Sequence, residues 1–439
     1  MDGMRSAAAR LRQVRLARYF GRVGAIQGGI ILVAGLNGHA ALGDRVIFST
    51  ASGAPLFGEV VSLLPDAAAV LPEGPTDGLS IGTRVELLFA PLLAPADAWI
   101  GRIINPFGQP LDGRPLAGGT RERGFRSPPP PAAGRNRLGA RLNTGLAVFD
   151  TILPLVRGQR MGLFAGSGVG KSTLLSALAK GVSADVVVIG LIGERGRELR
   201  EFVEETLGPE DMARAVVVAA TSDQSPLMRR RCAWAAMTVA EHFRDQGRHV
   251  LFLADSITRF AEAHREIALS AGEAPSYRGF PPSTSHLIMS LAERSGPGPQ
   301  GSGDITAIFS VLVAGSDMEE PVADILRGVL DGHVVLDRAI AERGRFPAVD
   351  VLRSVSRSLP HAASAQENAL IAKARDALGT YAESELMIRA GLYASGADPK
   401  LDEAVRLYPG LDVFFTRKCP DARQSFRALA ETPGLPPPR

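Results

Sequence analysis

The chain has 439 residues, of which 45% are hydrophobic, and a formal net charge of +3. This length predicts about two or three domains with sizeable cores, and so small a net charge does not by itself indicate nucleic-acid binding. No apolar run approaches the roughly 20 residues of a membrane-spanning helix. The two cysteines, Cys232 and Cys419, indicate neither a disulfide framework nor a zinc site. We therefore expect a cytoplasmic protein in a reducing compartment.

The first 21 residues form a basic segment with one acid, Asp2. Its arginines stand among alanine and leucine, and they are Arg5, Arg10, Arg12, Arg15 and Arg18. The pattern leaves three interpretations open: a solvated, frayed terminus, an amphipathic docking helix, or a mitochondrial transit peptide.

Residues 22–92 carry short β-like runs separated by turn signals such as Asn37-Gly38 and Gly43-Asp44. The runs are Gly29–Val33, Arg45–Ser49, Phe57–Leu63 and Thr83–Phe89. Short strands at this spacing are typical of a small all-β barrel. We expect such a barrel to form a separate N-terminal domain.

Residues 93–375 are predicted to form a parallel-sheet α/β core, because apolar strand-like runs alternate with helical patterns there. A proline-rich linker, Ser127–Pro131, precedes most of these runs. From Gln366 onward alanine, leucine, glutamate and arginine dominate, and the helices end near Leu429. Residues 376–439 are therefore predicted to form a C-terminal helical domain.

A loop of small residues follows the apolar run Arg160–Ala165 and precedes a helical run, Leu174–Ala179. Such a turn directs backbone N–H groups at phosphate oxygens, while the loop lysine reaches the β- and γ-phosphates and the following hydroxyl ligates Mg²⁺. One departure is that alanine stands where the strict pattern has its first glycine. The predicted nucleotide-binding residues are Ala165, Gly166, Ser167, Gly168, Val169, Gly170, Lys171, Ser172 and Thr173.

Two further apolar runs end in acidic residues. Val186–Ile192 leads to Glu194 and Arg195, and Val250–Ala254 leads to Asp255, with Arg259 four residues later. Ligands in open α/β sheets lie at the carboxyl ends of the strands. Glu194 is therefore a candidate to polarise the attacking water, and Asp255 a candidate Mg²⁺ carboxylate. Alternatively, Glu194 could form a surface salt bridge, and Asp255 could cap a helix.

Far downstream, the run SVSR ends at Arg357. Phosphoryl transfer needs a phosphate cradle, a metal anchor, a carboxylate that positions water and a cation for the developing charge. The sequence offers one candidate for each requirement. Lys171 belongs to the cradle, Asp255 would anchor the metal, Glu194 would position water, and Arg357 would supply the cation. The sequence therefore predicts a nucleotide hydrolase.

These motifs, in the order barrel, phosphate loop and helical tail, resemble the catalytic subunits of rotary F-type and V-type ATPases. Within that superfamily the chain most resembles the flagellar type III export ATPases over nearly its whole length from about residue 22. The segments that carry this resemblance are Thr221–Arg231 (TSDQSPLMRRR), Leu251–Phe260 (LFLADSITRF), Arg278–Ser283 (RGFPPS) and Leu336–Ala348 (LDRAIAERGRFPA).

The resemblance implies a RecA-like core, ATP as substrate with Mg²⁺, and roles for matching residues. Lys171 and Ser172 match the loop lysine and metal-binding hydroxyl, Glu194 matches the catalytic glutamate, and Asp255 matches the metal carboxylate. The other matches are Arg195 (a phosphate-sensing arginine), Arg259 (an arginine near the γ-phosphate), Arg357 (a finger that reaches a neighbouring subunit's nucleotide) and Phe346 (an aromatic that stacks on adenine). A core role for Phe346 stays open.

The resemblance also implies partners. It predicts a homohexamer, a dimeric regulator bound at the N-terminus, and a coiled-coil stalk protein in the central channel. The loop Pro275–Ser285, with Tyr277 and Phe280, is expected to face that stalk, although both aromatics could instead be buried. Export gate, chaperones and flagellar substrates are further expected partners. Contact with acidic lipids would hold the protein peripherally at the inner membrane.

Three alternatives remain from the sequence. The first is a virulence-type secretion ATPase. The second is an ion-coupled ATP synthase subunit, which the presence of Glu194 and Arg357 in one chain disfavours, because this pairing suits a ring of identical subunits. The third is an RNA translocase, which would need stacking aromatics in its N-terminal domain. Phe48, Phe57 and Phe89 are isolated there, so we expect no nucleic-acid partner.

Overall fold

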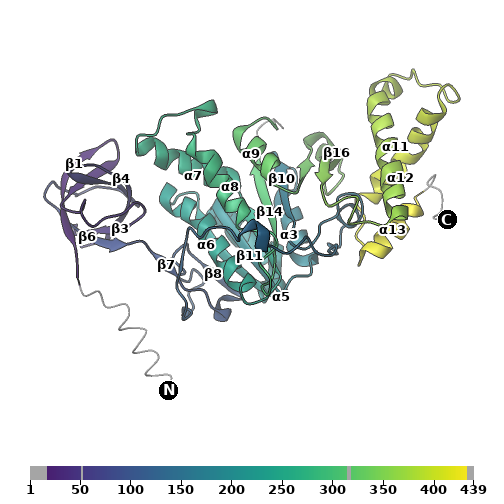
Figure 1. Ribbon diagram of the computed structural model, residues 1–439. Coiled ribbons are helices and arrows are strands. Elements are labelled where there is room, and N and C mark those ends of the chain that lie inside the picture. Colours follow the sequence, from purple (N-terminus) through teal and green to yellow (C-terminus); the bar gives the residue numbers. More distant parts are fainter. Residues whose placement is uncertain (1–16, 51–52, 314–317, 433–439) are drawn as a thin grey trace.

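The computed structural model describes residues 17–50, 53–313 and 318–432. Figure 1 shows a barrel and a group of C-terminal helices at opposite ends of a central sheet. This confirms the predicted order of barrel, α/β core and helical tail. Residues 1–16, which hold most of the predicted docking segment, lie outside the described residues.

The barrel is closed by strands in the order β1-β2-β5-β4-β3-β6. The four predicted strands are present, and two more, at Phe20–Gln27 and Ala67–Pro72, were missed. Gly21 on the first strand lies so close to the neighbouring backbone that a Cβ there would be 2.5 Å from the Ala34 carbonyl oxygen. The bounds are β1 (Phe20–Gln27), β2 (Ile30–Ala34), β3 (Arg45–Phe48), β4 (Leu56–Leu63), β5 (Ala67–Pro72) and β6 (Arg84–Phe89).

An eight-stranded sheet of order β16-β15-β10-β14-β13-β11-β12-β8 forms the core. All neighbours pair in parallel except β15 and β16. The strands are near-continuous apolar runs because helices cover both faces. Their bounds are β8 (Arg102–Ile104), β10 (Arg160–Ala165), β11 (Val186–Glu194), β12 (Ala215–Thr221), β13 (Val250–Asp255), β14 (Ile305–Leu312), β15 (Gly332–Leu336) and β16 (Val349–Ser356).

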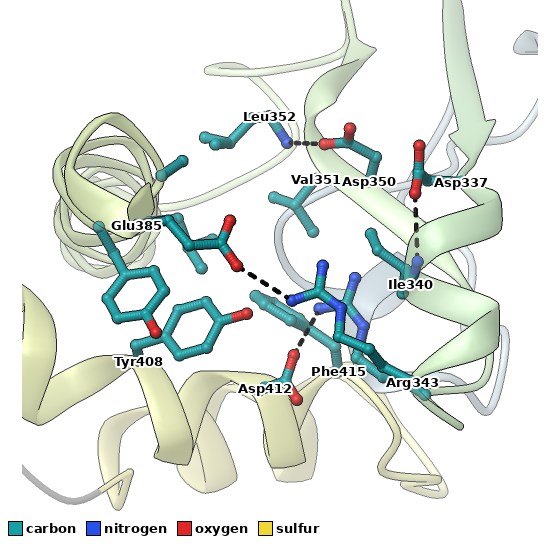
Figure 2. A pocket seen from close by; sticks show the side chains of 14 residues that line it. Asp337, Ile340, Arg343, Asp350, Val351, Leu352, Glu385, Tyr408, Asp412 and Phe415 are labelled. Carbon is teal, nitrogen blue, oxygen red and sulfur yellow. Dashed lines mark hydrogen bonds and ion pairs between the residues drawn. The ribbon is translucent and has the colours of Figure 1, made fainter. Parts of the chain in front are cut away.

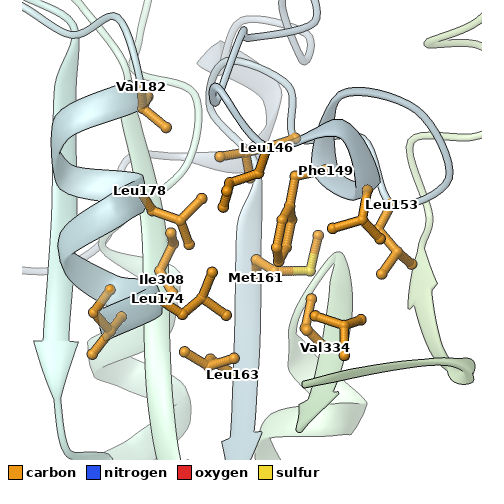
Figure 3. Close-up of a cluster of buried hydrophobic side chains, with 14 of the residues drawn as sticks. Leu146, Phe149, Leu153, Met161, Leu163, Leu174, Leu178, Val182, Ile308 and Val334 are labelled. Atoms are coloured by element: carbon orange, nitrogen blue, oxygen red, sulfur yellow. The ribbon is translucent and has the colours of Figure 1, made fainter. Parts of the chain in front are cut away.

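Alternate residues of the central strands enter two hydrophobic clusters, one on each face of the sheet. On β13, Leu251 and Leu253 join one cluster, whereas Phe252 and Ala254 join the other. Figure 3 shows part of the first cluster, in which Leu174 and Leu178 of the phosphate-loop helix pack near Met161 and Leu163 of β10. The helix that follows the loop is thereby fixed against the strand that precedes it.

The other elements of this central region are the helices, several single-turn helices and a two-stranded ribbon. They are β7 (Leu92–Leu93), η1 (Asp97–Trp99), β9 (Arg123–Gly124), η2 (Ala132–Gly134), α2 (Ala147–Asp150), α3 (Lys171–Gly181), α4 (Gly196–Glu201), η3 (Phe202–Leu207), α5 (Gly208–Met212), α6 (Pro226–Arg244), α7 (Ile257–Ser270), η4 (Tyr277–Gly279), α8 (Ser283–Glu293), α9 (Pro321–Val329) and α10 (Arg338–Glu342). Cys232 and Cys419 are both free.

The C-terminal helices are α11 (Ala365–Arg389), α12 (Pro399–Phe414) and α13 (Ala422–Ala430). A capping box between Ser364 and Glu367 starts α11, which crosses residue 376, the predicted start of the helical domain. Asp398 and Asp421 cap α12 and α13. Within the described ranges, no helix has both the length and the apolar character that crossing a bilayer requires.

A buried ion network joins the barrel to the core. Glu59 of β4 accepts hydrogen bonds from Arg230, at 2.7 Å, and from Arg231, both on α6. Arg231 also reaches Glu73, at 3.1 Å. The Glu59 and Arg231 side chains are 6% and 3% exposed, so each charge depends on its partners rather than on water.

Replacing Glu59 with glutamine should therefore destabilise the protein strongly, because buried Arg230 would lose its carboxylate partner and buried Arg231 would lose one of its two. Breaking a buried pair from one side costs about 3–5 kcal/mol, so the urea midpoint of unfolding should fall clearly. Glu86→Gln is the matched control on the same barrel, since its partner Arg18 is 63% exposed and such a pair contributes about 0–1 kcal/mol. Equal midpoints for the two variants would contradict this account.

Candidate active site

The phosphate loop lies at the carboxyl edge of the central sheet. β10 ends at Ala165, and α3 begins at Lys171. Gly168 and Gly170 have φ of 75° and 86°, a left-handed conformation that favours glycine. Ala165 is the last residue of an extended strand and is buried, so alanine is accommodated at this position.

The structure brings together three predicted site residues, one at the start of α3 and two at the ends of strands. The Lys171 ammonium pairs with Asp255 at the end of β13 and lies 3.6 Å from Glu194 at the end of β11. Both carboxylates are largely buried, with side chains 5% and 18% exposed. The lysine therefore supplies the positive charge that lets two acids share a poorly solvated site.

Glu194 has an unusual environment. Burial raises its pKa to about 7, the Lys171 charge opposes this shift, and Asp255 and Glu198 add to it. Its Oε1 atom is buried and has no hydrogen-bond partner. Near neutral pH this carboxyl group therefore exchanges a proton readily, as a base that accepts a proton from water must.

A cavity of about 130 Å³ opens beside these acids. Its lining is oxygen-rich, and it comprises Ser172, Leu191, Glu194, Glu198, Leu199, Glu201, Phe202, Thr206 and Asp255. A hydroxyl and carboxylates are the hard oxygen donors that Mg²⁺ takes, and this metal binds proteins through one or two such groups together with substrate phosphates. The donor set, together with a Glu194 Oε1 atom that has no hydrogen bond, thus fits a Mg²⁺–nucleotide complex.

Two predicted arginines lie near this edge but are engaged elsewhere. Arg195 is the residue that precedes α4, and its exposed side chain lies 3.4 Å from Glu198. Arg259 on α7 binds Glu262 at 2.8 Å, and its stem lies against Gly193. Among the described residues, the carboxylates that pair with these arginines are Glu198 and Glu262 rather than Asp255.

Arg357 is not part of the same cluster. Ala165 is level with Leu336 on β15, and Leu336 with Val349 on β16. Ser356, by contrast, pairs with Gly332 at the other end of β15. Arg357 therefore lies roughly 13 Å or more along the strands from the phosphate loop, and its side chain bonds to the Arg327 carbonyl, at 3.3 Å.

Phe346 flanks the phosphate loop. A Cβ on Gly170 would lie 3.3 Å from its ring, and the side chain is half exposed, at 51%. A half-exposed ring is not a core residue, so the structure excludes that alternative. Phe346 presents an apolar face next to the loop, as a stacking site for a base requires.

Sequence reasoning missed two features of this region. Ser310 on β14 donates a hydrogen bond to Asp255 at 2.5 Å. The second feature is a cavity of about 230 Å³ between the core and the C-terminal helices. Figure 2 shows Glu385 facing Arg343 in that cavity, with Tyr408 and Asp412 beside them. Neither feature has a local sequence signal, because each depends on how distant segments pack.

Comparison with known proteins gives consistent matches. Residues 145–356 match the ATP synthase alpha/beta family, nucleotide-binding domain, and residues 363–431 match the T3SS EscN ATPase C-terminal domain. The chain is 47% identical over 421 residues to a flagellum-specific ATP synthase of Caulobacter vibrioides, covering 94% of this chain and 95% of the relative.

Two solved structures are also similar over most of the chain. One is the assembled ATPase EscN of the enteropathogenic E. coli type III secretion system, with a TM-score of 0.86 and 34% identity. The other is assembled EscN in complex with its central stalk EscO, with a TM-score of 0.83 and 35% identity. Both matches cover 94% of this chain and 99% of the EscN chain.

Proposed function

The chain belongs to the family of flagellum-specific ATP synthases, an ATPase branch of the ATP synthase alpha/beta family, and we propose that it hydrolyses ATP to energise flagellar protein export. The observation that carries this proposal is the Lys171 ammonium between Glu194 and Asp255, beside the Ser172 hydroxyl. The match to EscN supports a virulence-type secretion ATPase as the alternative. The 47% identity to a flagellum-specific relative favours the flagellar apparatus.

In the proposed reaction the loop from Ala165 to Thr173 cradles the phosphates through its backbone N–H groups. Lys171 leaves the carboxylates and neutralises the β- and γ-phosphates. Ser172 and Asp255 would hold Mg²⁺, which supplies positive charge to the phosphate oxygens. Glu194 positions the attacking water and accepts its proton, a role that suits a buried carboxyl group with a raised pKa.

The remaining site residues are proposed to act on other parts of the nucleotide. Phe346 stacks on adenine, because its exposed face lies next to Gly170. Arg259 moves from Glu262 to the γ-phosphate, and Arg195 responds to phosphate from the start of α4. Both arginines carry exposed or half-exposed side chains held by single carboxylates, so an exchange of partners costs little.

We propose that Arg357 completes the active site of a neighbouring subunit. Its distance from the phosphate loop of its own chain prevents action in cis. A ring of identical subunits, proposed as a hexamer, would place each Arg357 at the nucleotide of the next chain. The assembled state of the similar EscN structure supports such self-association.

We assign the other proposed partners to particular parts of the chain. The predicted parts are the basic segment 1–21, the barrel 22–92, the ATPase core 93–375 and the helical domain 376–439. The basic N-terminal segment would bind a dimeric regulator and touch acidic lipids at the inner membrane. The loop Pro275–Ser285 would contact a coiled-coil stalk, as the EscN complex with its stalk supports. Export gate, chaperones and flagellar substrates would meet the ring at the export apparatus.

The pH dependence of hydrolysis tests the role of Glu194. Its carboxylate form is the active base, so kcat/KM should rise as the pH increases through about 7. Mg²⁺ is kept in excess of ATP so that the substrate does not itself titrate. Glu198→Gln should move this rise to lower pH, because Glu198 contributes to the raised pKa.

Glu194→Gln provides the matching loss of function. It should retain nucleotide while turnover falls by roughly 10²–10⁴, because the amide cannot accept the proton. A Glu194→Gln variant that turns over ATP near the normal rate would refute the assignment. A pH profile that Glu198→Gln leaves unchanged would also count against it.

Mixing two inactive variants tests the shared site. Lys171→Ala lacks the phosphate cation, and Arg357→Ala lacks the finger, a group worth roughly 10³–10⁵ in rate. Each variant alone should be inactive, and the mixture should regain part of the ATPase activity, since some interfaces pair an intact loop with an intact finger. No recovery in mixed rings, with full activity in a dilute monomer, would contradict action in trans.

Stalk binding tests the loop Pro275–Ser285, in which the two aromatics differ. Tyr277 is 62% exposed, whereas Phe280 is partly buried and packs against the core and against Arg265. Tyr277→Ser should weaken affinity for the coiled-coil stalk without changing the unfolding temperature. Phe280→Ser is the control and should lower the unfolding temperature. Unchanged stalk affinity in Tyr277→Ser would remove this residue from the interface.

A further inference from the structure

The strand β14 carries a hydroxyl group to the centre of the site. β14 lies between β10, which leads into the phosphate loop, and β13, which ends at Asp255. Ser310 is level with Leu163 on β10, and the preceding residue, Phe309, is level with Ala254 on β13. Ser310 therefore reaches the edge at which both functional strands end.

The hydroxyl of Ser310 is hydrogen-bonded to Asp255. Ser310 is fully buried, at 0% exposure, and its Oγ donates to Asp255 Oδ1 at 2.5 Å. The same Oδ1 atom receives the Lys171 ammonium. One carboxylate oxygen thus has two partners, one mobile on a long side chain and one fixed in the sheet.

Nucleotide binding should affect Lys171 and Ser310, the two partners of Asp255, differently. In the proposed function Lys171 turns to the phosphates, and Asp255, which is 4% exposed, loses that charge partner. A buried carboxylate without hydrogen bonds is costly and free to reorient. The Ser310 hydroxyl does not depend on the lysine, because the backbone of β14 holds it in place.

We propose that Ser310 is a positioning residue that fixes the orientation of Asp255 after Lys171 has left it. The inference rests on the proposed function, since it concerns Asp255 as a Mg²⁺ carboxylate. Hydrogen bonds to a metal-binding carboxylate set its orientation, and their loss typically weakens metal affinity about 10–100-fold. Ser310 touches no phosphate in this account and acts through Asp255.

The same strand offers a matched control at its other end. Thr306 is also fully buried, and its hydroxyl accepts a hydrogen bond from the Gly158 backbone, at 2.9 Å, and bonds to His249, at 2.8 Å. It lies four residues before Ser310, roughly 13 Å along the strand. Removing it tests the effect of losing a buried hydroxyl from β14 away from Asp255.

The test is equilibrium binding of a non-hydrolysable ATP analogue to the full chain, with Mg²⁺ and with EDTA. Ser310→Ala should bind the analogue normally in EDTA, because Lys171 and the loop remain. The gain in affinity on adding Mg²⁺ should shrink by about tenfold or more. Ser310→Thr keeps the hydroxyl and should retain the gain, and Thr306→Val should retain it as well.

A wild-type Mg²⁺ gain in Ser310→Ala would overturn the inference. So would an equal loss in Thr306→Val, which would indicate a general effect on the strand. If Ser310→Ala does not fold, Ser310→Thr decides, since a loss of the Mg²⁺ gain with the hydroxyl present contradicts positioning by that group. Normal analogue binding by Lys171→Ala would instead refute the proposed function, so the two failures are distinguishable.

Discussion

The ion pair between Lys171 and Asp255 is the interaction on which the site depends. Two carboxylates, Asp255 and Glu194, lie within reach of one ammonium group in a poorly solvated pocket. Such acids could not both remain ionised without a cation, because desolvation penalises each charge. The lysine thus offsets the carboxylate charge in this arrangement, and in the proposed function a Mg²⁺–nucleotide complex would have to do so once Lys171 turns to the phosphates.

Parallel pairing of the sheet brings this pair together. β10, β13 and β11 come from separate parts of the chain, yet their carboxyl ends share one edge. Alternation of side chains puts Leu251 and Leu253 on one face and Phe252 and Ala254 on the other, so two apolar layers fix the strand that carries Asp255. The positions of the charges therefore follow from the packing of uncharged residues on both sides of the sheet.

Sequence reasoning found the residues that carry local signals. An apolar run followed by a phosphate loop, or by a single acid, predicts Lys171, Glu194 and Asp255 as site residues without knowledge of the fold, and the structure places their side chains close together. Ser310 was missed because its meaning depends on strand order: it is 55 residues from Asp255, and a serine in an apolar run looks like any other strand residue. The first barrel strand was missed for a similar reason. Glycine fits position 21 because a Cβ there would meet the Ala34 carbonyl oxygen, and that contact depends on the pairing of the strands.

Two adjacent residues connect the nucleotide-binding edge with the C-terminal helices. Phe346 lies beside Gly170 of the phosphate loop, while Arg345 bonds to Asp412 of α12, at 3.0 Å, and to the Val349 carbonyl, at 2.6 Å. Two consecutive residues therefore contact the phosphate loop and α12. Arg357 lies beyond the opposite end of β15 and β16 from the phosphate loop, the position from which we propose that it acts on another chain. In the proposed function Phe346 contacts the base and Arg357 acts on the neighbouring chain's nucleotide, so ligand binding in one chain would have physical routes to its own helices and to the next chain.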